Sequence, residues 1–225
     1  MYNNKNLVKV RVWDLPTRIF HWALVVFIIC LAVSGLIVGA AMVWHFRFGY
    51  AVLSLLLFRI VWGLVGGRGS RFGAFIYAPQ SVISYLKGQG KPEHSVGHNP
   101  LGAGSVFAML AVLLAQVGSG LISDDEIASA GPLTRFVSGS VVNLATNYHK
   151  NIGKWLLLAL VVLHIVAIVY YLVKKHKLVQ AMLHGDKELI SPVPPSRDDI
   201  TSRVSALVIF GICAAFVYWI TSLAA

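Results

Sequence analysis

The chain contains eight histidines, and imidazole is the side chain best suited to bind a metal ion or the iron of a haem. Four of them, His21, His45, His149 and His164, lie within or at the ends of long apolar runs. An ionisable side chain at membrane depth is costly, and it marks a functional site by default. These four histidines are therefore the first candidates for ligands.

The spacing of the four histidines predicts two binding levels. The step from His149 to His164 covers about 22 Å of helix and turns the side chain by only about 60°. One helix thus offers two ligands on a similar face. We expect His45 to pair with His149 near the outer ends of the spans, and His21 to pair with His164 toward the cytoplasm. Two bis-histidine haems stacked across a membrane need ligands at two such levels.

A glycine follows each outer histidine at the same spacing, Gly49 after His45 and Gly153 after His149. In an α-helix, position i+4 lies one turn along the same face, so a glycine there leaves room for a porphyrin edge. Glycines that let helices approach closely are also common in membrane spans. Because the pattern occurs twice, each time at an outer histidine, it favours the haem interpretation.

Two arginines are candidates for the cofactor's propionates. Arg59 lies about two-thirds of the way along its span, where it could reach the cytoplasmic surface or pair with a propionate of the inner haem. Arg18, one turn before His21, could do the same or bind a lipid phosphate. Cys30 and Cys213 stand alone in apolar runs, and the chain has no Cys-x-x-Cys-His motif, so any haem is expected to be non-covalent.

The remaining histidines are interpreted differently. His94, His176 and His184 lie in basic loops and are expected to be solvated. His98 sits in Gly97-His98-Asn99-Pro100, where Asn and Pro indicate the start of a helix. We expect a structural role for His98 at the membrane interface, with contact to a quinone or a haem propionate as the alternatives.

Composition requires that these residues be positioned by membrane helices. The sequence is 57% hydrophobic and 12% charged, with a mean hydropathy of +0.72, whereas soluble domains are about 25% charged. The formal net charge of +10 does not indicate nucleic acid, because most basic residues flank apolar runs. The first run is too long for the core of a signal peptide and is read as a retained span. Five segments are long enough to cross a bilayer: 18–40, 44–66, 101–122, 152–173 and 203–223.

The loops orient these spans. Most basic residues lie before the first span, after the second and after the fourth, so the positive-inside rule places the N-terminus in the cytoplasm and the C-terminus outside. The basic residues on the expected cytoplasmic side are Lys5, Lys9, Arg11, Arg18, Arg68, Arg71, Lys87, Lys91, Lys174, Lys175, Lys177, Lys187, Arg197 and Arg203. The outer loop 124–150 is expected to form a cap on which a soluble partner could dock. The Pro-rich segment 191–195 resembles a hinge before the fifth span.

These residues resemble the prokaryotic cytochrome b561 family, which also contains the b-type cytochrome subunits of nickel-iron hydrogenases. The resemblance rests on Val12-Trp13-Asp14, Arg18-Ile19-Phe20-His21-Trp22, His45-Phe46-Arg47-Phe48-Gly49, Arg59, Trp62-Gly63, Gly97-His98-Asn99-Pro100-Leu101-Gly102, His149-x-x-x-Gly153 and Leu163-His164. It covers roughly residues 10–175. It implies a four-helix core that binds haem b through His21, His45, His149 and His164, and electron exchange between membrane quinone and a partner.

The expected fold is all-α: a polytopic membrane protein with a four-helix haem-binding core in residues 1–190, and a linker and fifth transmembrane helix in residues 191–225. The expected function is that of a di-haem b-type cytochrome in the bacterial inner membrane, an electron-transfer component of a quinone-linked oxidoreductase. It would pass electrons between quinone and a periplasmic c-type cytochrome or hydrogenase.

Two alternatives remain open. A stand-alone quinone-linked haem oxidoreductase would use the same ligands. A metal transporter would need about four N, O or S ligands at one point, and no intramembrane carboxylate or cysteine pair completes such a set.

Overall fold

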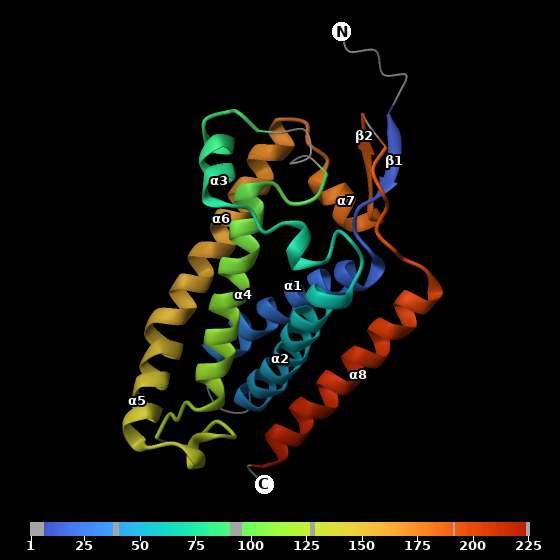
Figure 1. The fold of residues 1–225 in the computed structure, drawn as a ribbon. Helices are drawn as coiled ribbons and strands as arrows, with labels where there is room; N and C mark the ends of the chain where they lie inside the picture. Colours follow the sequence, from blue (N-terminus) through green and yellow to red (C-terminus); the bar gives the residue numbers. More distant parts are fainter. Residues whose placement is uncertain (1–6, 38–40, 91–95, 127–128, 191, 224–225) are drawn as a thin grey trace. The chain divides into compact units, whose positions relative to one another are not determined.

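Five long helices dominate the computed structural model, which describes residues 7–37, 41–90, 96–126, 129–190 and 192–223 (Figure 1). Within these residues, five helical segments are long and apolar enough to cross a membrane. They are α1 (Leu15–Leu36), α2 (Ala41–Val65), α4 (Pro100–Leu121), the continuous run Gly139–Val173, and α8 (Ile200–Ser222). The prediction of a polytopic helical protein with five spans is confirmed. His94, Lys5, Lys91 and Ser191 lie outside the described residues.

Shorter elements connect the spans. They are β1 (Val8–Arg11), β2 (Asp186–Leu189), the one-turn helices η2 (Phe72–Ala74) and η4 (Thr134–Phe136), α3 (Pro79–Leu86) and α7 (Leu178–His184). The two strands pair antiparallel, with Val8 opposite Leu189 and Arg11 opposite Asp186. No strand was predicted at either end of the chain. Strands this short gain their stability from each other, and their partners are nearly 180 positions apart.

The fourth span differs from its prediction. Helix α5 (Gly139–Asn147) continues through a π-helical turn, η5 (Tyr148–Gly153), into α6 (Lys154–Val173). The expectation that all of 124–150 forms a loop is therefore wrong, because its second half is helical. Gly, Ser and Asn lower the mean hydropathy of residues 139–147. The helix was therefore not predicted, although its apolar residues are regularly spaced.

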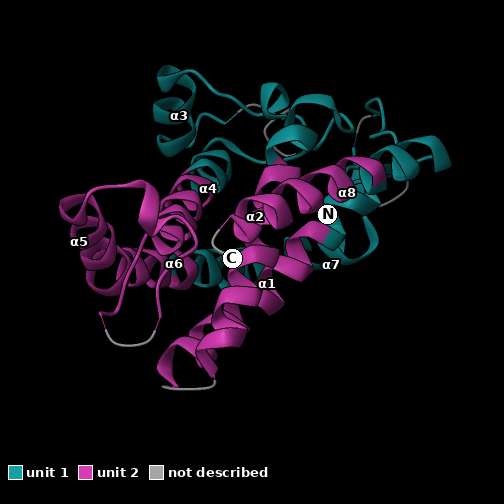
Figure 2. Ribbon diagram, turned by 90° about the horizontal axis from the view of Figure 1, so that it is seen from below, with its two compact units in different colours: residues 1–19, 60–107, 163–207 teal, residues 20–59, 108–162, 208–225 magenta. Residues whose placement is uncertain are grey.

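The chain divides into two compact units, which take different parts of these helices (Figure 2). One unit comprises residues 1–19, 60–107 and 163–207, and the other comprises 20–59, 108–162 and 208–225. We call them the sheet unit and the histidine unit, after the β1–β2 pair in the first and His45 and His149 in the second.

Asp14 organises the start of α1 in the sheet unit. Its fully buried carboxylate accepts hydrogen bonds from the backbone N–H of Thr17 (2.9 Å) and of Gly67 (3.2 Å). It also accepts bonds from the indole N–H of Trp62 (3.3 Å) and the hydroxyl of Ser70 (2.5 Å). The bond from Thr17, three residues on, is the N-cap that a helix start requires. The same carboxylate thus caps α1 and binds the end of α2.

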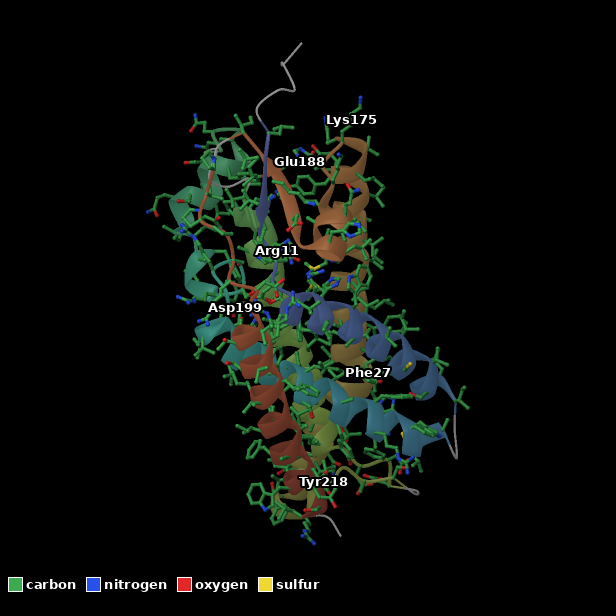
Figure 3. All side chains as sticks on the ribbon, turned by 90° about the vertical axis from the view of Figure 1, so that its right-hand side faces the viewer. Arg11, Phe27, Lys175, Glu188, Asp199 and Tyr218 are labelled. Atoms are coloured by element: carbon green, nitrogen blue, oxygen red, sulfur yellow. The ribbon has the colours of Figure 1, made fainter. Side chains whose placement is uncertain are left out.

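Asp198 is a second hub of the sheet unit. It accepts hydrogen bonds from Arg11 (2.5 Å), from Arg203 (3.1 Å) and from the backbone N–H of Leu15 (3.1 Å). Arg11 also forms an ion pair with Asp186 at 2.5 Å, which links β1 to β2. The two strands can be found in Figure 3 by the labels of Arg11 on β1 and Glu188 on β2. Burial tends to raise the pKa of Asp198, but the bonds from Arg203 and Leu15 and the charge of Arg11 outweigh it, so its pKa is lowered.

These contacts fix the segment before α8 in place. The backbone N–H of Ser196 donates to Arg11 O at 2.8 Å, and the Ser196 hydroxyl accepts from the N–H of Gly69 at 2.7 Å. Residues 196–199 are thus bonded to β1, to the start of α1 and to the loop after α2. The Pro-rich segment 191–195, expected to be a hinge, is therefore followed directly by a segment that is hydrogen-bonded to the rest of the sheet unit.

The apolar surface of the long helices fits a bilayer. No residue of α6 is buried inside the protein, and side chains such as Val166 and Leu172 are more than half exposed. Apolar burial in the histidine unit is concentrated on α2 and α4, where Val52, Leu56 and Leu113 are almost completely buried. Apolar side chains that face outward along whole spans are stable in lipid and not in water.

Candidate functional site

His45 and His149 meet within the histidine unit. Their ring centroids are 6.2 Å apart, and the ring planes stand at 89° to each other. Imidazole nitrogens bind metal ions at about 2.0 Å, so two rings on opposite sides of one ion have centroids roughly 6 Å apart. The separation of the two rings therefore fits two axial ligands that share one iron.

One nitrogen of each ring is already used in a hydrogen bond to the protein. His45 Nδ1 lies 3.2 Å from the carbonyl oxygen of Leu31, and His149 Nδ1 lies 2.8 Å from that of Gln116. Because a carbonyl only accepts, each Nδ1 must carry the hydrogen and donate it. The nitrogen left without a proton in each neutral ring is Nε2, which is the atom that can bind iron. Ligating histidines usually donate their second N–H in this way.

Each of the two rings lies against a glycine of a neighbouring helix. A Cβ on Gly35 would stand 3.1 Å from His45 Cε1, and a Cβ on Gly120 would stand 2.9 Å from His149 Cε1. Each glycine follows a serine whose hydroxyl oxygen lies near the same ring, Ser34 at 3.3 Å from His45 Nδ1 and Ser119 at 3.4 Å from His149 Nδ1. The sequence contains a sign of these shared contacts, because Ser-Gly-Leu-Ile occurs at 34–37 and again at 119–122.

His149 lies in the π-helical turn η5, so the position of Gly153 relative to His149 differs from the one predicted for an α-helix. A π-turn bonds residue i to i+5, so Gly153 does not lie one α-helical turn beyond His149. A Cβ on Gly153 would meet Gln116 Oε1 and the ring of Tyr148. Gly153 thus makes room for the Gln116 side chain, whose Nε2 donates to the carbonyl oxygen of His149 at 3.1 Å.

Gly49 is different. Apart from its chain neighbours and the backbone of its own helix, no atom of the described residues lies within 4 Å of the position that its Cβ would occupy. Open space therefore lies at Gly49, whereas protein side chains fill the space at Gly153.

The other two candidate ligands lie in different units. His21 is in the part of α1 that belongs to the histidine unit, next to Trp22, with ring centroids 5.0 Å apart. His164 is in the part of α6 that belongs to the sheet unit. Both side chains are half-buried.

The two arginines differ in their surroundings. Arg59 is 3% exposed, so the alternative in which it extends to the cytoplasmic surface does not hold. Arg18 donates to the carbonyl oxygen of Leu183 at 2.7 Å and lies 3.8 Å from Asp198. Arg18 is therefore part of the charged cluster of the sheet unit, and no described residue partners its buried Nε.

His98 has the surroundings of a structural residue. Its ring lies between Phe75, at a centroid distance of 4.5 Å, and Trp13, at 4.6 Å. Its carbonyl oxygen accepts a hydrogen bond from Tyr77 at 2.8 Å. The next residue, Asn99, caps α4 through a bond from the N–H of Gly102 at 2.8 Å, so the predicted helix start is confirmed.

The described residues contain no group of three or more His, Cys, Asp or Glu side chains that could hold a metal ion. The pair His45 and His149 offers two nitrogens, which suits a haem, whose porphyrin supplies the other four ligands to iron. It does not suit a zinc site, which needs about four protein or water ligands.

Known proteins resemble this chain in sequence. The family model described as prokaryotic cytochrome b561 matches residues 12–185. The "Probable Ni/Fe-hydrogenase B-type cytochrome subunit" of Rhizobium leguminosarum bv. viciae is 25% identical, over 79% of this chain and 88% of that protein. The corresponding protein of Cupriavidus necator is 25% identical, over 73% and 81%. The "Probable Ni/Fe-hydrogenase 1 B-type cytochrome subunit" of Escherichia coli K12 is 26% identical, over 71% and 82%.

Proposed function

The chain belongs to the prokaryotic cytochrome b561 family, and from that membership we propose that it is a membrane b-type cytochrome that carries electrons between quinone and a periplasmic redox partner. The observation that carries the proposal is the pair His45 and His149, with ring centroids 6.2 Å apart and each Nδ1 bonded to a carbonyl oxygen. Two such rings would suit as the two protein ligands of a haem b.

The residues of the chain bind and orient the cofactor. His45 and His149 would hold one haem through Nε2, and the open space at Gly49 would leave room for a porphyrin edge. Haem b, when bound, supplies the one-electron chemistry. Apolar residues such as Val52 and Leu113 keep water away from the helices that carry the ligands, and burial of this kind helps to set the potential of a haem.

A second haem is proposed on His21 and His164. Both stand within spans, where an ionisable side chain is costly, and the positive-inside rule places both toward the cytoplasm. Arg59, buried in the same span as His45, is proposed to pair with a propionate, because a guanidinium can form charge-assisted hydrogen bonds with a carboxylate. This arrangement would give an electron path across the bacterial inner membrane, with quinone exchange at the cytoplasmic side.

The partner follows from the relatives. Their names describe cytochrome subunits of nickel-iron hydrogenases, so a hydrogenase is the first candidate for the periplasmic partner and a c-type cytochrome is the second. We propose that it docks on the segment 124–150, which includes α5. A stand-alone quinone-linked oxidoreductase is the alternative function.

The test is haem analysis of the purified membrane protein. The wild type is expected to show a bis-histidine b-type spectrum and two haems per chain. His149→Ala and His45→Ala should each remove one haem, and His21→Ala and His164→Ala should each remove the other. His184→Ala, at the exposed C-terminal end of α7, is the matched control and should keep both. A folded wild type without a Soret band would overturn the proposal.

A further inference from the structure

Two short sequences in different helices hold the two ligand rings in the same way. Ser34-Gly35 near the end of α1 contacts His45, and Ser119-Gly120 near the end of α4 contacts His149. In each case the carbonyl that accepts from Nδ1 belongs to the residue three positions before the serine, Leu31 or Gln116. We call each set a Ser-Gly cradle.

The serine has the same role in both cradles. Ser34 Oγ donates to the carbonyl oxygen of Cys30 at 2.7 Å, and Ser119 Oγ donates to that of Gln116 at 2.9 Å. Each hydroxyl hydrogen is therefore directed to the backbone of its own helix. A lone pair of the same oxygen is left to face the imidazole N–H, so the N–H is shared between a carbonyl and a hydroxyl.

The glycine fixes the position of the ring. The absence of a side chain at Gly120 lets His149 lie against the backbone of α4, since a Cβ there would be 2.9 Å from Cε1 and 3.2 Å from Nδ1. Gly35 does the same for His45, with distances of 3.1 Å and 3.2 Å. Hydrogen bond and backbone contact together set both the tilt and the rotation of each ring.

We propose that the two Ser-Gly cradles are positioning elements that hold the axial imidazoles at right angles and set the electronic state of the haem between them. The inference rests on the proposed function. An imidazole donates π-electron density to the iron d orbital perpendicular to its own plane. Two rings at 89° raise two d orbitals equally and leave them nearly degenerate. Hydrogen bonds from Nδ1 make the ligands more basic, which stabilises ferric iron.

The cradles therefore have two measurable consequences. A ferric haem with perpendicular ligand planes gives a strongly anisotropic low-spin EPR signal with a large maximum g value. The hydrogen bonds from Nδ1 lower its midpoint potential. Neither property would depend on Ser34, Gly35, Ser119 or Gly120 if these residues only packed helices.

The experiment compares cradle variants with matched controls in the full-length protein. Ser119→Ala and Ser34→Ala each remove one acceptor from a ligand N–H, and each should raise the midpoint potential, changing the redox equilibrium constant a few-fold. Ser54→Ala is the control, because the buried Ser54 also donates to its own helix, to Tyr50 O at 2.9 Å, and has no described contact with His45 or His149. It should leave the potential unchanged.

Gly120→Ala tests the ring orientation. The added methyl displaces the His149 ring, so the maximum g value should fall, or the haem should be lost from a folded protein. Gly118→Ala is the control on the same helix, because no described atom lies within 4 Å of its Cβ position, and it should keep both haem and signal. His149→Ala identifies which EPR signal belongs to this haem.

The outcomes separate the inference from the proposed function. If His149→Ala leaves haem content and spectrum unchanged, the ligand assignment is wrong. If His149→Ala removes a haem but the cradle variants match their controls in potential and EPR signal, the function stands and the cradles have no positioning role.

Discussion

Gln116 and His149 are joined by two hydrogen bonds of opposite direction. The His149 ring donates from Nδ1 to the backbone oxygen of Gln116 at 2.8 Å, and the Gln116 side chain donates from Nε2 to the backbone oxygen of His149 at 3.1 Å. Gln116 thus gives the backbone of the π-turn a hydrogen-bond donor from another helix. The ligand ring and the turn that carries it are thus held by the same residue.

The first prediction concerns this side chain. Gln116→Leu removes the donor to the His149 carbonyl and should lower the free energy of unfolding by about 1–2 kcal/mol. It should also weaken haem retention, because the turn that carries His149 loses its support. Thermal unfolding and haem stoichiometry measure the two effects. Asn151→Ala, an exposed residue of the same turn, should change neither, and an equal effect of both variants would contradict the prediction.

The second prediction concerns Asp14. Asp14→Ala removes the carboxylate that accepts from the buried N–H groups of Trp62 and Gly67, and the loss of a buried hydrogen bond costs about 1–3 kcal/mol. The loss of the N-cap on Thr17 adds about 1 kcal/mol. The midpoint of thermal unfolding should therefore fall markedly. Glu188→Gln is the control. It removes only the exposed ion pair between Glu188 on β2 and Lys177, so it should have little effect. A wild-type midpoint for Asp14→Ala would show that the network does not stabilise the fold.

The third prediction concerns pH. The pKa of Asp198 is lowered in the folded protein, so its stabilising contribution is complete above its unfolded pKa and is lost as the pH falls through the folded value. Asp198→Asn should lower the free energy of unfolding by about 2 kcal/mol at neutral pH. The difference from wild type should shrink below about pH 4, where the unfolded carboxyl takes up its proton. A difference that stays constant with pH would mean that the charge of Asp198 is not the cause.

The spans were predictable because hydropathy and length alone identify a membrane helix. All five segments were found, and the start of α4 at Asn99-Pro100 was correctly read from its capping residues. The strand pair was not predicted, since Val8–Arg11 and Asp186–Leu189 are short and each depends on a partner at the other end of the chain. The role of Asp14 was also missed, because its four donors come from residues 17, 62, 67 and 70.

The pairing of His45 with His149 was predicted from depth, and in the structure the two rings meet. The prediction for the two glycines assumed α-helix at both positions, and at Gly153 the helix is a π-turn. The π-turn at Tyr148–Gly153 is contacted by Gln116, a residue of another helix, and no local sequence pattern predicted the turn. The repeated Ser-Gly-Leu-Ile could have pointed to the residues that contact the two rings. It was overlooked because hydrophobic periodicity, which identifies helices and strands, does not detect a short repeat of this kind.

The last prediction uses the contrast between the two glycines that follow the histidines. Gly153→Ala places a methyl against Gln116 Oε1 and the Tyr148 ring, so it should destabilise the protein whether or not haem is present. Gly49→Ala meets no described atom within 4 Å, so it should leave the unfolding midpoint of the haem-free protein unchanged or slightly raised, since alanine favours helix. In the haem-loaded protein, Gly49→Ala should reduce haem content, because the methyl occupies the space assigned to the porphyrin edge. Equal haem content in Gly49→Ala and wild type would place the porphyrin elsewhere and leave Gly49 as a lipid-facing residue.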